Sequence, residues 1–138
     1  MNNTTKYDEK LGKYSHFINH PQMIPFVGKY WGKNKKLLVI GESHYLPKDS
    51  KKETIRNWYN ITSDKLSEDE CWWTATADLI NIAGENQNYE SQGHLIWKNI
   101  ELAILETGFN PIDQSNMFRY ISYMNFFQRP AQETGESI

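Results

Sequence analysis

The sequence lacks the marks of a secreted, disulfide-bonded or membrane protein. It holds one cysteine, Cys71, so no disulfide can form within the chain. Its apolar runs are too short to span a bilayer, and residues 1–10 (MNNTTKYDEK) lack the apolar centre of a signal peptide. We therefore expect a cytoplasmic protein that does not associate with membranes.

The sequence also lacks an excess of charge of either sign. Its 15 Lys and Arg residues nearly balance 17 Asp and Glu residues, giving a net charge of −2 at pH 7. Such a chain has no general basic surface for nucleic acid, although a local basic patch could still meet phosphates. The charge balance alone therefore does not point to a nucleic-acid partner.

Short metal-binding spacings are missing as well. The sequence has no CxxC pair and no HExxH pattern, although it contains residues of suitable ligand types: His16, His20, Glu42, His44 and His94. We therefore expect no metal site and no cofactor.

Aromatic residues are abundant, at 14% of the chain, against a modest total hydrophobic content of 38%. Aromatic side chains each bury a large area, so these residues can support one domain over residues 1–138. Residues 1–10 and 131–138 are polar and are expected to be flexible. Between them, residues 11–30 predict a short helix followed by an extended arm, because Pro21 and Pro25 interrupt any longer helix.

A short apolar run at residues 37–40 (LLVI) predicts a buried and central β-strand, because it is continuous and ends at Gly41. An acid, a hydroxyl, an imidazole and a phenol follow directly: Glu42, Ser43, His44 and Tyr45. In open α/β sheets, ligands bind beyond the carboxyl ends of the strands. This polar segment is therefore the first candidate site.

Three helical segments follow. Residues 53–59 predict one or two helical turns. Ser67 and Glu70 form a capping-box pattern, which predicts a single helix over residues 67–84 that Gly84 ends. Apolar residues at helical spacing predict a further helix over residues 94–107, ended by Gly108.

A second strand is predicted over residues 116–127, which are rich in aromatic residues. A strand, several helices and another strand indicate an α/β fold with a parallel pair. Two strands alone make a poor sheet, so we expect either a longer protein of which this is the N-terminal portion, or a partner such as a second copy in a homo-oligomer.

Two motifs, GESHY at residues 41–45 and MNFFQRP at residues 124–130, resemble those of the uracil-DNA glycosylase superfamily, in particular its GESHY-type branch. The resemblance implies a three-layer sandwich, with a parallel sheet between helices. It also implies a ligand that contains a nucleobase and an N-glycosidic-bond-cleaving or DNA-binding activity, of the kind used in DNA repair.

The resemblance assigns roles residue by residue. In the family pattern Gly-Gln-Asp-Pro-Tyr, Gly41 and Tyr45 match, and Tyr45 would pack beside the base. Asn125 resembles the asparagine that binds the polar edge of the base, and Phe126 and Gln128 lie beside it as further substrate-binding residues. Stacking and hydrogen bonds to the base edge are how such proteins hold a base taken out of the helix.

The catalytic roles depart from the family pattern. Glu42, Ser43 and His44 stand in the places of glutamine, the water-activating aspartate and proline, and a serine cannot act as a carboxylate base. The family's late histidine has no counterpart, since no histidine follows His94.

Basic side chains follow the first motif. Lys48, Lys51 and Lys52 are the expected contacts to nucleic-acid phosphates.

Two alternatives stay open. A glycine and a serine after the first strand also resemble the opening block of SGNH-type ester hydrolases, with Ser43 as the nucleophile. Those enzymes supply a late Asp-x-x-His, which this chain lacks. The other alternative is a homologue without catalysis that binds a nucleotide or nucleic acid.

Overall fold

The computed structural model describes the chain apart from residues 34, 51, 53–54, 86–94, 110–115 and 132–138. Its strands are β1 (Phe26–Val27), β2 (Leu37–Gly41) and β3 (Ile121–Asn125). Its α-helices are α1 (Asp8–Leu11), α2 (Ser15–Asn19), α3 (Ile55–Tyr59), α4 (Glu68–Trp73), α5 (Thr76–Glu85) and α6 (Leu95–Glu106). Its short 3-10 helices are η1 (Pro21–Met23), η2 (Ser63–Lys65) and η4 (Met117–Tyr120). None of the helices in this described part is long and apolar enough to cross a membrane.

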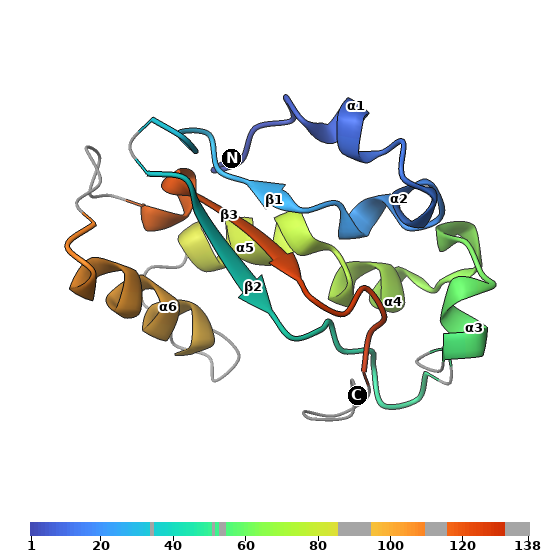
Figure 1. The fold of residues 1–138 in the computed structure, drawn as a ribbon. Coiled ribbons are helices and arrows are strands. Elements are labelled where there is room, and N and C mark those ends of the chain that lie inside the picture. Colours follow the sequence, from blue (N-terminus) through green and yellow to red (C-terminus); the bar gives the residue numbers. More distant parts are fainter. Residues whose placement is uncertain (34, 51, 53–54, 86–94, 110–115, 132–138) are drawn as a thin grey trace.

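The strands form a mixed sheet in the order β1-β3-β2 (Figure 1). β2 runs parallel to β3, from Leu37 opposite Ile121 to Gly41 opposite Asn125, so the predicted parallel pair is confirmed. β1 lies antiparallel on the other side of β3. The prediction that the first strand is central is wrong: β3 is the centre, and within the described ranges β2 is an edge strand.

The burial of β2 follows from its place at the edge. Its residues alternate between half-buried and exposed, and the Leu38 and Ile40 side chains are 53% and 56% exposed. In β3, by contrast, four of the five residues are buried. A continuous apolar run predicted a strand buried on both faces, but one face of β2 has too little packed against it.

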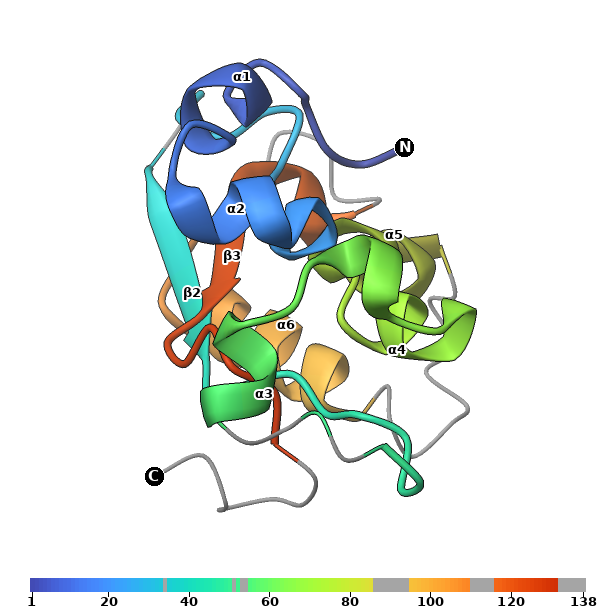
Figure 2. The same ribbon diagram turned by 90° about the vertical axis from the view of Figure 1, so that its right-hand side faces the viewer.

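Helices α5 and α6 lie on the same side of β2 and β3 (Figures 1 and 2). The main core forms between them and the sheet, because Ile80 of α5 and Trp97 of α6 pack against Ile121 and Tyr123 of β3. The odd-numbered side chains of β2, Leu37 and Val39, point into this core.

The predicted helix over residues 67–84 is two helices. Its start is confirmed, since Ser67 and Glu70 form the capping box in both directions. The helix is then interrupted between α4 and α5 at Thr74, whose hydroxyl donates to the Glu70 backbone carbonyl oxygen at 2.8 Å. Such a side-chain hydrogen bond competes with the backbone hydrogen bonds of a helix, which is consistent with the end of α4 here.

Gly84 lies inside α5 and does not end it. A Cβ atom there would come within 2.8 Å of the Asn116 side-chain nitrogen, which donates to the Gly84 carbonyl oxygen. Gly84 therefore allows the start of the β3 segment to approach α5 closely, a reason that the sequence pattern did not reveal.

The N-terminal residues contact the rest of the fold, while their predicted flexibility stays a prediction. Asn3 pairs with Gly28 next to β1, and the N-terminus lies close to that strand in Figure 1. Asn2 is buried, its backbone N–H donates to the Asn81 side chain at 2.9 Å, and its own side-chain oxygen accepts from Arg119 at 3.2 Å. Asn2 thus has hydrogen-bond partners that lie far away in the sequence.

The later elements match the sequence pattern in part. Helix α6 ends before Gly108, which has a positive φ of 74°, as a glycine helix stop requires. The predicted strand over residues 116–127 begins instead as η4, because the Asn116 side chain accepts from the Phe118 backbone N–H at 3.0 Å. Ala131 is buried, and residues 132–138 lie outside the described residues.

Candidate functional site

The two polar segments that follow β2 and β3 lie side by side. The backbone N–H groups of Phe126 and Phe127 donate to the carbonyl oxygens of Gly41 and Glu42, at 2.8 and 2.9 Å. Farther along, Tyr45 forms a parallel bridge with Ala131. The parallel pairing thus continues past the ends of both strands, so the two motifs lie next to each other.

Gly41 is in contact with two side chains of β3. A Cβ atom on Gly41 would collide with the Tyr123 hydroxyl and with the side-chain oxygen of Asn125. The φ of Gly41 is ordinary, so the need for glycine here comes from this close approach and not from the backbone conformation. The first motif begins with glycine because the second motif occupies its side-chain space.

Tyr123 and Asn125 form a buried polar pair. The Tyr123 hydroxyl donates to the Asn125 side-chain oxygen Oδ1 at 2.7 Å. Burial, with a smaller contribution from the charge of Tyr45, raises the pKa of Tyr123 to about 12, so this hydroxyl stays protonated and keeps its role as a donor. The bond occupies Oδ1, which leaves the amino group of the Asn125 amide as the donor for a ligand.

Tyr123 was missed at the level of the sequence. Alternation along a strand places it on the same face as Asn125, two residues later, and that spacing is the signal that could have revealed it.

Gln128 is also bonded to Asn125. Its side-chain amino group donates to the Asn125 backbone carbonyl oxygen. The Gln128 backbone carbonyl oxygen accepts from the Trp58 indole N–H at 3.0 Å. The remaining side-chain oxygen, Oε1, is buried and has no hydrogen-bond partner. A buried acceptor without a partner costs about 1 to 3 kcal/mol, so it marks a place where a ligand donor would be stabilising.

Three aromatic side chains lie along the two motifs. Phe126 is 69% exposed, and its ring meets the half-buried Phe127 ring edge to face, at 5.0 Å between centroids. Tyr45 is half-buried and close enough to Tyr123 to affect its pKa. Phe126 therefore offers an exposed aromatic ring directly after Asn125 in the chain.

The three residues predicted to be catalytic do not converge. Glu42 is exposed, whereas Ser43 and His44 are buried. The His44 ring nitrogen Nε2 lies 3.0 Å from the Thr76 hydroxyl of α5, so the imidazole is directed toward α5. Burial lowers the pKa of His44 to about 4, and a hydrogen bond with the Trp73 backbone opposes the shift only in part. His44 is therefore neutral near pH 7 and holds the chain after β2 against α5.

The three lysines predicted to contact phosphates are placed differently. Lys48 is exposed, and Lys51 lies outside the described residues. Lys52 forms an ion pair with the buried carboxylate of Glu70 at 2.7 Å and donates to the Lys65 carbonyl oxygen at 2.8 Å. Lys52 therefore anchors the loop after the first motif, while the phosphate role of the three lysines stays a prediction.

The carboxylate at the centre of this anchor is strongly held in its charged form. Burial would raise the pKa of Glu70, but hydrogen bonds from Lys52, Ser50 and the Ser67 backbone outweigh it and lower the pKa to about 2. The Ser50 hydroxyl donates to the other carboxylate oxygen at 2.6 Å. Ser50 and Lys52 thus fix the loop after the first motif to the start of α4.

Metal ligands do not gather in the described part of the chain, where no group of three His, Cys, Asp or Glu side chains could hold an ion. His16 and His20 lie together, with ring centroids 5.1 Å apart, and His20 stacks on Trp58 at 4.3 Å. His94 lies outside the described residues.

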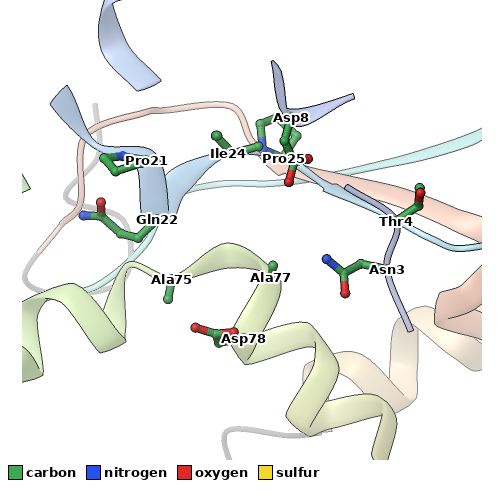
Figure 3. A pocket seen from close by; sticks show the side chains of 10 residues that line it. All are labelled: Asn3, Thr4, Asp8, Pro21, Gln22, Ile24, Pro25, Ala75, Ala77 and Asp78. Atoms are coloured by element: carbon green, nitrogen blue, oxygen red, sulfur yellow. The ribbon is translucent and has the colours of Figure 1, made fainter. Parts of the chain in front are cut away.

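A cavity of about 140 Å³ lies elsewhere, between residues 3–8, residues 21–25 and the start of α5 (Figure 3). Asp8 and Asp78 line it from opposite sides, and burial raises the pKa of Asp8. It is smaller than the usual pockets for small molecules. None of the residues predicted for the site lines this cavity.

Comparison with models of protein families, with curated proteins and with solved structures finds no match.

Proposed function

We propose that the protein is a uracil-DNA glycosylase-like protein that binds a nucleobase, alone or within a nucleic acid, beyond the carboxyl ends of β2 and β3. The observation that carries the proposal is the unpartnered, buried Oε1 atom of Gln128, whose side-chain amino group donates to the Asn125 backbone carbonyl oxygen. The three-layer form of the fold and the cytoplasmic location belong to the same proposal.

The chemistry of the two amides fits one edge of a pyrimidine. Asn125 offers an N–H donor, because its oxygen is occupied by Tyr123. Gln128 offers an acceptor that lacks a donor. A uracil edge presents a carbonyl oxygen next to a ring N–H group, which is the complementary order of acceptor and donor. Forming both bonds would satisfy a buried group and add specificity.

The aromatic groups fit the faces of a base. Phe126 is largely exposed, so its ring is available for stacking, which contributes about 1 to 3 kcal/mol per base. Tyr45 lies on the neighbouring motif, where the resemblance places the residue that packs beside the pyrimidine.

The geometry supports binding better than bond cleavage. Glu42 is the one carboxylate of the first motif, and it is exposed instead of being held beside the buried amides. The imidazole of His44 is bound to Thr76, so it is not directed at Ser43 as the base of an ester hydrolase would be. The contact of His44 with Thr76 therefore does not favour the hydrolase alternative.

The first test is fluorescence anisotropy with labelled single-stranded oligonucleotides that carry uracil or cytosine at one position, over a salt series. We expect tighter binding to the uracil strand, and a logarithm of affinity that falls linearly with the logarithm of salt. Equal weak binding to both strands, or no binding at low salt, would contradict the proposal.

Two variants locate the binding site. Asn125→Asp keeps an acceptor for the Tyr123 hydroxyl but removes the amide donor, so affinity for uracil should fall about tenfold or more. Phe126→Ala removes an exposed ring and should lower the affinity for every base by a similar factor. Trp72→Ala is the control, since Trp72 is 48% exposed on α4 and outside both motifs.

A separate assay decides whether the bound base is released. Free uracil is measured by chromatography for the native chain and for Ser43→Ala and Glu42→Gln. We expect binding without turnover. Release that both variants abolish while they keep their affinity would instead establish catalysis at the first motif.

A further inference from the structure

The outer edge of β2 is open in the described part of the chain. The Gly41 carbonyl oxygen accepts from Phe126, so residues 37, 39 and 41 direct their backbone groups to β3. Leu38 and Ile40 therefore direct theirs away from the sheet. An open edge with apolar side chains is a template for pairing with another strand, and proteins generally cover or charge such edges.

The exposed side chains of this edge form a defined pattern, here called the β2 stripe: Lys36, Leu38, Ile40 and Glu42. All four are exposed. Alternation places Leu38 and Ile40 on one face of β2, while Lys36 precedes the strand and Glu42 follows it at a bend. Two apolar residues occupy the centre, a positive charge stands at one end and a negative charge at the other. The stripe is thus complementary to itself when its direction is reversed.

We propose that two copies of the chain pair antiparallel through β2, about a two-fold axis at Val39, and form a six-stranded sheet. In this register Leu38 of each copy lies opposite Ile40 of the other, with their free backbone groups facing each other. Lys36, which precedes the strand in each copy, then lies near Glu42, which follows the strand in the other copy. Apolar and opposite-charge pairs across antiparallel strands are each stabilising.

Charge complementarity favours a second copy of this chain as the occupant. A two-fold axis brings the same patch of both subunits together, so an attractive contact must appear twice. The stripe meets this condition, since reversal brings each lysine to a glutamate. Parallel pairing would instead bring Lys36 to Lys36 and Glu42 to Glu42.

Helix α6 provides further apolar surface for the same dimer. Leu95, Leu102 and Leu105 are 48%, 51% and 44% exposed, at spacings that place them on one face of the helix. A two-fold axis perpendicular to the sheet keeps α6 of both copies on the same side of it. Pairing of five-residue strands is small for a stable interface, and these leucines would enlarge it.

The test is the mass of the purified chain by sedimentation velocity at increasing concentration. We expect a dimer at about 0.1 mM. Lys36→Glu places two glutamates opposite each other at both ends, and Glu42→Lys does the same with lysines. Each variant alone should raise the dimer dissociation constant about tenfold. Circular dichroism checks that these surface variants remain folded.

Mixing the two variants gives the decisive measurement. A chain with Lys36→Glu and a chain with Glu42→Lys are complementary at both ends, so an equimolar mixture should recover the affinity that each has lost. The double variant Lys36→Glu/Glu42→Lys should recover it as well. Lys10→Glu, on the exposed surface of α1, is the control of equal charge change and should dimerise like the native chain.

Three results would overturn the proposal. The native chain could remain a monomer at the highest concentration. The single variants could dimerise as well as the native chain, which would assign the dimer to another surface. The mixture could fail to recover, which would exclude the antiparallel register about Val39.

Discussion

β2 and β3 are parallel strands of five residues each, and they differ in what surrounds them. β3 has a strand on both sides and helices over one face, and Ile121 in it is fully buried. β2 has one strand neighbour among the described residues, and Ile40 in it is more than half exposed. β2 (LLVIG) is the more apolar of the two, since β3 (ISYMN) contains a serine and an asparagine, so their place in the sheet, not their composition, decides how much each contributes to stability.

The largest expected effect separates two isoleucines. Ile121→Ala should lower the free energy of unfolding by about 3 to 4 kcal/mol, because it leaves a cavity in the main core. Ile40→Ala should cost less than about 1 kcal/mol, because that side chain is mostly exposed. Urea unfolding of both variants, each in a Lys36→Glu background that suppresses association, makes the comparison. Equal losses would show that β2 is buried after all.

The second effect depends on pH and concerns the segment after β2. His44 has a folded pKa of about 4 against an ordinary 6.5, so between these values the unfolded chain binds a proton that the folded chain excludes. Stability from this group is complete above pH 6.5 and falls as the pH approaches 4, by about 2 to 3 kcal/mol. Urea unfolding at several pH values measures it.

His44 is one of several groups with a shifted pKa, so its contribution must be measured separately. Burial, and then the charge of His20, lowers the pKa of His16 to about 4 as well, so His16 acts in the same range. Glu70, with a pKa of about 2, acts only below pH 4.5. An NMR titration that follows the His44 ring alone should give its pKa directly. A value near 6.5 would refute its burial against α5.

A third and smaller effect tests the contact between the strands. Gly41→Ala should cost about 2 kcal/mol, because the new methyl group meets the Tyr123 hydroxyl and the Asn125 side chain. Tyr123→Phe removes that hydroxyl and should restore part of the loss in the double variant, so the two substitutions are not additive. Thermal unfolding of the native chain, the two single variants and the double variant completes this double-mutant cycle. If the two losses of stability simply add, the result would argue against the contact.

The smallest effect concerns the other neighbour of β3. The Ser122 hydroxyl donates to the Phe26 carbonyl oxygen at 2.9 Å, which links β1 to β3. Ser122→Ala should cost about 1 kcal/mol in unfolding free energy. Ser15→Ala, an exposed serine at the start of α2, serves as the control. A Ser122 variant as stable as this control would mean that the bond adds nothing.

The sequence by itself determined the features that depend on near neighbours. The capping box at Ser67 and the glycine stop at Gly108 were predicted correctly, because their groups lie within a few residues of each other. The parallel pairing of the strands followed from the long helical connection between them. The adjacency of the two motifs followed in turn, since parallel strands end at the same edge.

Only the tertiary structure decided which strand is central, why Gly41 must be glycine and where His44 points. Each of these depends on groups far away in the sequence: β1 beside β3, Tyr123 beside Gly41, and Thr76 beside His44. The same holds for Asn2, a buried polar residue whose backbone N–H donates to Asn81 and whose side-chain oxygen accepts from Arg119, while its side-chain nitrogen has no hydrogen-bond partner. Apolar patterns and motifs show what a segment can form, but burial requires knowing what packs against it, and only the folded chain brings those partners together.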